Sequence, residues 1–251
     1  MAMGSQPHHG VGAEFGDNQQ VLEALRATPL LNELAEPSLN RLAGISRVIR
    51  VAEGTLLCEE GEPASELFIV LDGQVAVLAQ AANGTSAVVE VLDAGATMGL
   101  SAVLAGLPLL MTARVVRAAR LLSIDGEGLR ALTAQEPPLV TVLLRAEAEG
   151  FKALVQQVCD LKLRTTAQRL AVYLLSLSPE KSGNTTALRL PFDKRLLAAR
   201  LGCRQENLSR AFAALRTLGV ETHGARVILH DIARLRDYAL PDDSMGSKVS
   251  V

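Results

Sequence analysis

One stretch decides the fold: Lys194-Arg-Leu-Leu-Ala-Ala-Arg-Leu-Gly-Cys-Arg-Gln-Glu-Asn-Leu-Ser-Arg-Ala-Phe-Ala-Ala-Leu-Arg216. Apolar residues recur at helical spacing on both sides of Gly202: Leu196, Leu197 and Leu201 before it, Leu208, Phe212 and Leu215 after it. Glycine adopts the backbone conformations of a tight turn that other residues resist. The stretch is therefore predicted to be two helices joined by a short turn, a helix-turn-helix.

The second of these helices exposes polar side chains near its N-terminus, which is the end that enters the major groove of DNA in this motif. They are Arg204, Gln205, Glu206, Ser209 and Arg210, with Arg216 at the far end. The next segment, residues 220–229, reads as a β-hairpin turning at Gly224, the expected wing. A winged helix-turn-helix that binds double-stranded DNA is predicted. An αα-hairpin without a DNA role has the same apolar spacing and is the alternative.

Charge is distributed unevenly, although the net charge of the chain is only -2. Residues 162–240 hold 14 Lys and Arg against 6 Asp and Glu, a net +8. Residues 1–161 hold 10 against 19, a net -9. A basic C-terminal half behind an acidic N-terminal half indicates that only the former meets a polyanion. An ordinary charged surface is the alternative interpretation.

The N-terminal half is predicted to be a small β-roll. After helices at Asn18–Arg26 and Ser38–Ile45, the latter capped by Ser38, short β-type segments alternate with glycines. The segments are Arg47–Val51, Glu66–Leu71, Gln74–Leu78, Ala87–Leu92 and Thr112–Val116. The pairs Asp72-Gly73 and Asn83-Gly84 lie between segments and are predicted to form hairpin turns.

A long helix follows Pro137-Pro138. Its apolar residues repeat in heptads, interrupted by Glu147: Val140, Leu144, Phe151, Leu154, Val158 and Leu161. Such a stripe favours pairing with a second copy of the helix in a homodimer; packing against its own domain is the alternative. Thr165 and Gln168 form a capping box that starts the next helix. The predicted organisation is a disordered tail (1–17), a β-roll (18–136), a dimerisation helix (137–161), the DNA-binding domain (162–240) and a second disordered tail (241–251).

Composition narrows the class of protein further. Cys58, Cys159 and Cys203 are widely spaced, so no disulfide framework is indicated. No apolar stretch is long enough to span a bilayer, and the first 16 residues lack the basic and apolar regions of a signal peptide. A cytoplasmic protein without a membrane partner is expected.

Over residues 18–240 the chain resembles the CRP/FNR regulators. Gly54–Pro63 and Leu67–Val75 are similar to the β-roll pattern of that family, and Gly202–Arg210 to its recognition helix. The resemblance implies an α+β protein with a cyclic-nucleotide-binding-like jelly roll, a long dimerisation helix and a winged helix-turn-helix. It also implies a homodimer that acts on double-stranded DNA with RNA polymerase and has no enzymatic activity.

The resemblance also bears on the effector. Family members that bind cyclic AMP hold the ribose with a Gly-Glu pair and the cyclic phosphate with an Arg-Ser or Arg-Thr pair. Here Leu100 stands at the position of the acid and Met111 at that of the arginine. Since an apolar side chain cannot neutralise a phosphate, cyclic AMP is not expected as a ligand. Three scattered cysteines cannot supply the four thiolates of an iron–sulfur cluster, so that cofactor is not expected either.

What remains is an almost wholly apolar pocket region: Met98, Leu100, Leu104, Met111 and Thr112. It suits a hydrophobic ligand or haem, as in the carbon monoxide and nitric oxide sensors of the family; filling of an ordinary core is the alternative. The roll contains no histidine, so a haem ligand would come from His8, His9, Met98, Met111 or Cys58. Cys58 is either a redox-reactive thiol or inert packing. No metal site can be assigned.

The predicted recognition helix resembles the FNR branch, which reads TTGAT half-sites, and nitric-oxide-responsive regulators of denitrification are the nearest subfamily on this basis. In that resemblance Arg210 reads guanine, Glu206 accepts from cytosine N4, and Ser209 lies beside a thymine methyl. Arg204, Gln205 and Arg216 contact phosphate or a neighbouring domain. A cyclic-nucleotide-binding regulatory subunit of an enzyme or channel is the rival function. A cupin-type metal enzyme is excluded because the roll has no histidine.

Overall fold

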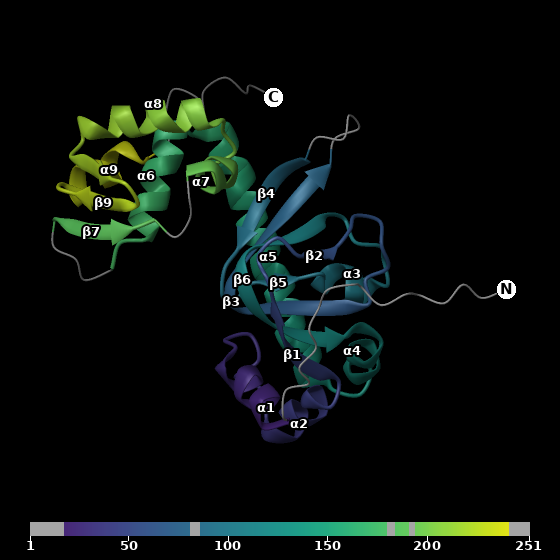
Figure 1. The fold of residues 1–251 in the computed structure, drawn as a ribbon. Coiled ribbons are helices and arrows are strands. Elements are labelled where there is room, and N and C mark those ends of the chain that lie inside the picture. The colour runs from purple at the N-terminus through teal and green to yellow at the C-terminus, as the bar shows by residue number, and fades with distance from the viewer. Residues whose placement is uncertain (1–17, 81–85, 180–183, 191–193, 241–251) are drawn as a thin grey trace, which may run out of the picture. The chain divides into compact units, whose positions relative to one another are not determined.

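The computed structural model describes residues 18–80, 86–179, 184–190 and 194–240 (Figure 1). The chain divides into two compact units, residues 1–150 and 151–251, and each is described by itself. The predicted tails (1–17 and 241–251) and the Asn83-Gly84 turn lie outside the described residues.

The first unit joins an antiparallel sheet to short helices and the first half of a long one. Its strands are β1 (Ser46–Val51), β2 (Leu56–Cys58), β3 (Glu66–Gln80), β4 (Ser86–Leu92), β5 (Thr97–Met98) and β6 (Thr112–Asp125). Its helices are α1 (Asn18–Ala27), α2 (Glu36–Ala43), α3 (Leu100–Ala105), α4 (Gly126–Thr133) and the start of α5 (Pro137–Leu163). The strands are ordered β1-β6-β3-β4, with β2 paired to β6 and β5 to β3. The predicted roll is confirmed.

Two apolar clusters lie on opposite faces of the same strands. Phe68 and Val70 of β3 pack inside the roll with Val115 and Leu121 of β6. The alternate residues Leu67 and Ile69 pack with Leu122 and Ile124 of β6 against helices α1 to α5. Because side chains alternate across a strand and both faces are covered here, the run Leu67-Phe-Ile-Val70 is apolar throughout.

The predicted hairpin turn at Asp72-Gly73 is wrong. Residues 66–80 form the single strand β3, and its register with β6 shifts at this pair, where Asp72 faces Arg120 and Gln74 faces Arg117. Gly73 has φ 90°, and a Cβ atom there would lie 2.4 Å from the carbonyl oxygen of Ala118. The glycine therefore marks a bulge with a close backbone approach, which needs the same residue type as a turn.

The predicted start of α2 is also wrong. The helix begins at Glu36 with Ala35 as N-cap, so Pro37 lies inside the first turn and Ser38 is not the cap. Proline is tolerated there because the first amides of a helix have no acceptor within the helix. The carbonyl of Ala35 accepts from the amides of Ser38 at 2.9 Å and Leu39 at 3.1 Å.

The second unit holds the rest of α5, four further helices and a small sheet within the described residues. They are α6 (Thr166–Ser176), β7 (Thr186–Arg189), α7 (Lys194–Arg200), α8 (Gln205–Arg216), β8 (Val220–His223), β9 (Arg226–Leu229) and α9 (Ile232–Tyr238). The predicted capping box is confirmed: Thr165 accepts from the amide of Gln168, whose side chain accepts from the amide of Thr165. The antiparallel sheet has the order β7-β9-β8.

Candidate DNA-binding interface

The helix-turn-helix consists of α7, the turn at residues 201–204 and α8. Gly202 has φ 61°, in the left-handed region that favours glycine. The amide of Gly202 donates to the carbonyl of Ala199 at 2.9 Å, and that of Cys203 to Ala198 at 2.9 Å, so the turn closes the end of α7. On α8 the predicted apolar face is buried, with Leu208, Phe212 and Leu215 in the interior and Ala211 beside them.

The opposite face of α8 is exposed. Arg204, Gln205, Glu206, Ser209 and Arg210 are all exposed, and the structure brings these five together at the N-terminal end. Arg216 is also exposed but is the last residue of the helix, about 9 Å beyond Arg210 along the axis at 1.5 Å per residue. Neither Glu206 nor Arg210 forms an ion pair with another described residue. Both charges are therefore available to a ligand.

Ser209 lies between Glu206 and Arg210 in the sequence, and its side chain is already hydrogen-bonded. Its hydroxyl donates to the backbone carbonyl of Gln205 at 3.0 Å, one turn earlier. This bond occupies the only hydrogen of the side chain. Ser209 therefore presents a small surface rather than a free donor.

The wing is the hairpin of β8 and β9, and its prediction is confirmed. Val220 faces Leu229, His223 faces Arg226, and Gly224 supplies the turn with φ 61°. The amide of Leu190 donates to the carbonyl of Ala225 at 2.8 Å and so holds β7 beside the hairpin.

The wing carries a cluster of polar side chains that sequence reasoning missed. Nε2 of His223 lies 2.7 Å from one carboxylate oxygen of Glu221, and Nε2 of His230 lies 2.9 Å from the other. Hydrogen bonds from His230 and then His223 hold the pKa of Glu221 below its usual value. With Arg216 these residues line a hollow of about 370 Å³. The signal in the sequence was the two-residue spacing of Glu221 and His223, which puts both on one face of a strand.

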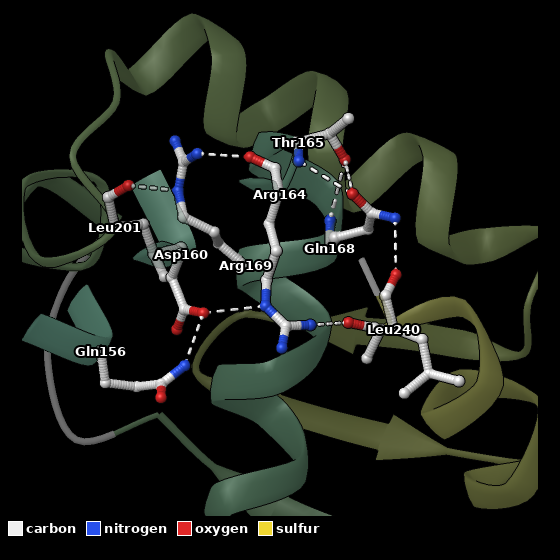
Figure 2. A network of polar contacts seen from close by, with 9 residues as sticks. Gln156, Asp160, Arg164, Thr165, Gln168, Arg169, Leu201 and Leu240 are labelled. Atoms are coloured by element: carbon white, nitrogen blue, oxygen red, sulfur yellow. Dashed lines mark hydrogen bonds and ion pairs between the residues drawn. The ribbon is translucent and has the colours of Figure 1, made fainter. Parts of the chain in front are cut away.

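A second polar network lies where the end of α5 meets the start of α6 and the turn of the helix-turn-helix (Figure 2). Arg169 donates to the carbonyl of Arg164 at 2.8 Å and to that of Leu201 at 3.0 Å. Arg164 in turn pairs with Asp160 at 2.9 Å. The network connects the end of α5 to the turn between α7 and α8.

The structure does not bring the five predicted pocket residues together. Leu100 and Leu104 belong to the cluster against the helices, whereas Met98 packs on the interior of the roll. Met111 is exposed, and the hydroxyl of Thr112 accepts from the amide of Glu60 at 3.1 Å. Leu100 is the buried first residue of α3.

The candidate haem ligands among the described residues show no arrangement that favours haem binding. Met98 and Met111 lie in different environments, and burial raises the pKa of the Cys58 thiol to about 11, against the thiolate that binds a metal. No three His, Cys, Asp or Glu side chains in the described part of the chain are arranged to hold a metal ion. His8 and His9 lie outside the described residues. The raised pKa of Cys58 favours its interpretation as packing.

The predicted stripe on α5 is exposed along its whole length. Phe151 is 70% exposed and Leu144 66%, and the other members are Val140, Leu154, Val158 and Leu161. The residues that α5 buries in the first unit are different ones, Leu139, Val142 and Leu143. Among the described residues no helix is long and apolar enough to cross a membrane.

Comparison with known proteins agrees with both halves of this architecture. Residues 48–136 match the cyclic nucleotide-binding domain family, and residues 168–238 match the Crp-like helix-turn-helix domain family. The crystal structure of a protein from Ruegeria pomeroyi, described as cyclic-nucleotide-binding, is similar to this one with a TM-score of 0.62. The two sequences are 31% identical, and the match covers 90% of this chain and 99% of that one.

Two further relatives are more distant. The CRP-like cAMP-activated global transcriptional regulator of Mycobacterium tuberculosis is 26% identical over 72% of this chain and 83% of its own length. FixK2 from Bradyrhizobium japonicum is 19% identical, with a TM-score of 0.67 over 77% of this chain and 97% of that one, and supports the fold alone.

A roll of the cyclic nucleotide-binding type followed by a Crp-like helix-turn-helix defines a class, the DNA-binding transcription regulators. The chain belongs to the CRP/FNR family of these regulators, which are not enzymes.

Proposed function

We propose that the protein works as a homodimer that reads a two-fold symmetric DNA site made of two TTGAT-like half-sites. The observation that carries this proposal is the arrangement of Glu206 and Arg210, exposed one turn apart at the N-terminal end of α8 without an ion pair to a described residue. An acidic side chain on a surface that meets a polyanion has a purpose mainly when it reads a base.

Each exposed residue then has a distinct role. Arg210 donates to O6 and N7 of a guanine, and Glu206 accepts from the N4 amino group of a cytosine. Ser209 packs beside a thymine methyl group, which agrees with a hydroxyl already bonded to Gln205. Arg204, Gln205 and Arg216 contact phosphates, which position the domain without reading sequence.

The surface charge supports the same partner. Residues 162–240 carry a net +8, and this excess belongs to the unit that contains the helix-turn-helix. Neutralisation of phosphates releases counterions from DNA and supplies much of the affinity.

Dimerisation is proposed through the α5 stripe. A long row of exposed apolar side chains, interrupted at Glu147, is uncommon on a monomeric protein and marks an interaction surface. The heptad spacing of the row fits a parallel pair of helices about a two-fold axis. Such a dimer presents two copies of α8 to two half-sites about one helical turn apart and leaves the rest of the surface for RNA polymerase.

The effector is proposed to be a small molecule other than a cyclic nucleotide. The relative from Mycobacterium tuberculosis is named as cAMP-activated. In this chain Leu100 is buried where an acid would face the ribose, and Met111 is exposed where an arginine would face the phosphate. Calorimetry with cyclic AMP and cyclic GMP should show no saturable binding below about 100 µM. Saturable binding in that range would contradict this part of the proposal.

The test of DNA reading is competition binding at fixed salt, on operators that differ by single base pairs within the half-site. Arg210→Ala should cost about 1–3 kcal/mol on the matched operator and flatten discrimination at the guanine. Glu206→Ala should raise affinity for unmatched DNA and weaken discrimination at the cytosine. Arg216→Ala should weaken all operators alike and lower the salt slope by about one.

Matched controls come from α9, where Arg236 and Asp237 are exposed. Arg236→Ala and Asp237→Asn change the charge of the same unit by the same amounts and should leave base preferences intact. Unchanged base preferences in both Glu206→Ala and Arg210→Ala would show that α8 is not the reader.

A further inference from the structure

Arg169, in the first turn of α6, joins the ends of two other helices. Its Nη1 donates to the backbone carbonyl of Arg164 at 2.8 Å, and its Nε donates to that of Leu201 at 3.0 Å (Figure 2). Arg164 directly follows α5, and Leu201 directly follows α7 and opens the turn of the helix-turn-helix. One side chain therefore connects the dimerisation helix to the DNA-reading motif.

The two acceptors are of the kind that an arginine binds well. The last carbonyls of a helix lack partners within the helix and carry part of the negative end of its dipole. The guanidinium is planar and always charged, and its donors point in fixed directions. It can therefore hold two carbonyls in one geometry, which the single ammonium of a lysine does less well.

Other contacts brace the same junction. Arg164 pairs with Asp160 of α5 at 2.9 Å and also donates to the carbonyl of Ala239, beyond α9. The buried Gln168 donates to the carbonyl of Leu240 at 2.9 Å. All of these residues lie in the unit formed by residues 151–251. The end of α5 is thus fixed to the domain that reads DNA.

We propose that Arg169 is a positioning residue for DNA binding, which fixes the spacing between half-sites that the dimer accepts. It holds the turn of the helix-turn-helix to the end of α5, and α5 carries the stripe Phe151, Leu154, Val158 and Leu161 that pairs the two copies. The inference rests on the proposed function, because spacing has meaning only when two copies read one symmetric site.

DNA geometry makes the consequence measurable. One added base pair moves a half-site about 3.4 Å along the duplex axis and turns it by about one tenth of a helical turn. Two recognition helices held rigidly on one dimer cannot follow that movement without losing contacts. A looser junction lets each domain turn toward its half-site, at the expense of discrimination between spacings.

The experiment measures the affinity of the full chain for a series of operators whose half-sites are constant and whose spacer changes in single base-pair steps. The readout is the affinity on the best spacer divided by that on a spacer one base pair longer or shorter. We expect a ratio of about 30 for the wild type and below about 5 for Arg169→Met, which keeps an apolar stem but has no donors. Arg169→Lys should lie between them.

A purely structural role would lower affinity on every operator and leave this ratio unchanged. Arg236→Met on α9 is the charge-matched control and should keep the wild-type ratio. Discrimination between bases within one half-site should also stay at the wild-type level in Arg169→Met, since α8 is not altered. If Arg169→Met folds poorly, Arg169→Lys decides on the same ratio.

If Arg169→Met folds and keeps the wild-type spacing ratio, this inference is wrong and the proposed function stays intact. The same conclusion follows if Arg169→Met does not fold and Arg169→Lys keeps the wild-type ratio. A wild-type protein that binds a single half-site as strongly as the symmetric operator overturns the proposed function and the inference with it.

Discussion

Gly202 and Leu161 pack so closely that a Cβ atom at Gly202 would lie 2.7 Å from Cδ2 of Leu161. Gly202 is the turn of the helix-turn-helix, and Leu161 is the last apolar residue of the α5 stripe. The contact brings the end of the proposed dimerisation helix directly against the DNA-reading motif, within the second unit of the chain.

Gly202→Ala should therefore destabilise the second unit. Alanine at φ 61° is strained by about 1–2 kcal/mol, and the contact with the Leu161 methyl adds a smaller cost because that side chain can shift. Denaturant unfolding of the variant should show a lower midpoint. Leu161→Ala in the same chain should recover only the steric part of the loss relative to Leu161→Ala alone.

Gly150 provides the opposite control. It lies within α5, and no atom would lie within 4 Å of an added Cβ. Since alanine is the better helix former, Gly150→Ala should stabilise the helix by about 0.5–1 kcal/mol. If both substitutions shift stability in the same direction, the turn at Gly202 is not under the constraint described.

Gly73→Ala is expected to be more damaging than either. Its Cβ would lie 2.4 Å from both the carbonyl oxygen of Ala118 and Cα of Ala119, and backbone atoms cannot move aside as a side chain does. We expect a loss of about 3 kcal/mol in the free energy of unfolding. Gly61→Ala is the matched control, because Gly61 has a similar φ of 84° with no atom within 4 Å of an added Cβ. Equal losses in the two variants would show that the close approach at the bulge does not exist.

Gly73 is an example of a feature that the sequence alone could not predict. A turn and a bulge both demand positive φ, so Asp72-Gly73 between two apolar segments carries no local signal that separates them. The distinction lies in the pairing of β3 with β6 across about 50 residues of chain. The start of α2 was missed for a related reason, since Pro37 is compatible with both a position before a helix and its first turn.

Local sequence patterns predicted more of the candidate DNA-binding site than of the bulge at Gly73. Exposure of Glu206 and Arg210 follows from the helical period of Leu208, Phe212 and Leu215, so the position of the reading face could be predicted. The pairing of Glu221 with His230 could not be predicted, because these residues are nine positions apart and the strand register of the wing brings them together. The separation of Leu100 from Met98 depends on the two faces of one sheet and is likewise invisible in composition.

The cluster at the wing predicts a pH-dependent contribution to stability. The pKa of Glu221 is lowered in the folded chain, chiefly by its hydrogen bond with His230 and then by that with His223. A carboxyl group with a lowered pKa stabilises the fold above its ordinary pKa, and this contribution is lost as the pH falls through the folded value. The thermal midpoint of Glu221→Gln should therefore fall below that of the wild type at pH 6, and the difference should shrink toward pH 3.

Asp237→Asn is the control for that comparison, because Asp237 is exposed on α9 outside the cluster. Its difference from the wild type should stay near zero across the same range. A difference for Glu221→Gln that grows as the pH falls would contradict the assignment of the lowered pKa to the two imidazoles.

The dimer itself is tested on the α5 stripe. Phe151 and Leu154 are 70% and 55% exposed in the single chain, and a partner helix would bury them. Phe151→Glu or Leu154→Glu would then place an unpaired carboxylate from each copy in the pairing surface, where each buried charge costs several kcal/mol. We expect the dimer dissociation constant to rise at least about 100-fold, equivalent to about 2.7 kcal/mol. Sedimentation equilibrium at micromolar concentration should then show monomers.

Ala153→Glu adds the same charge to an exposed position of α5 outside the stripe and should remain dimeric. Because Phe151 and Leu154 are exposed in the single chain and belong to neither apolar cluster of the first unit, the variants should keep the helical content of the wild type by circular dichroism. Dimers in both Phe151→Glu and Leu154→Glu would mean that the copies pair through another surface, and the two-fold arrangement of α8 would then need a different origin.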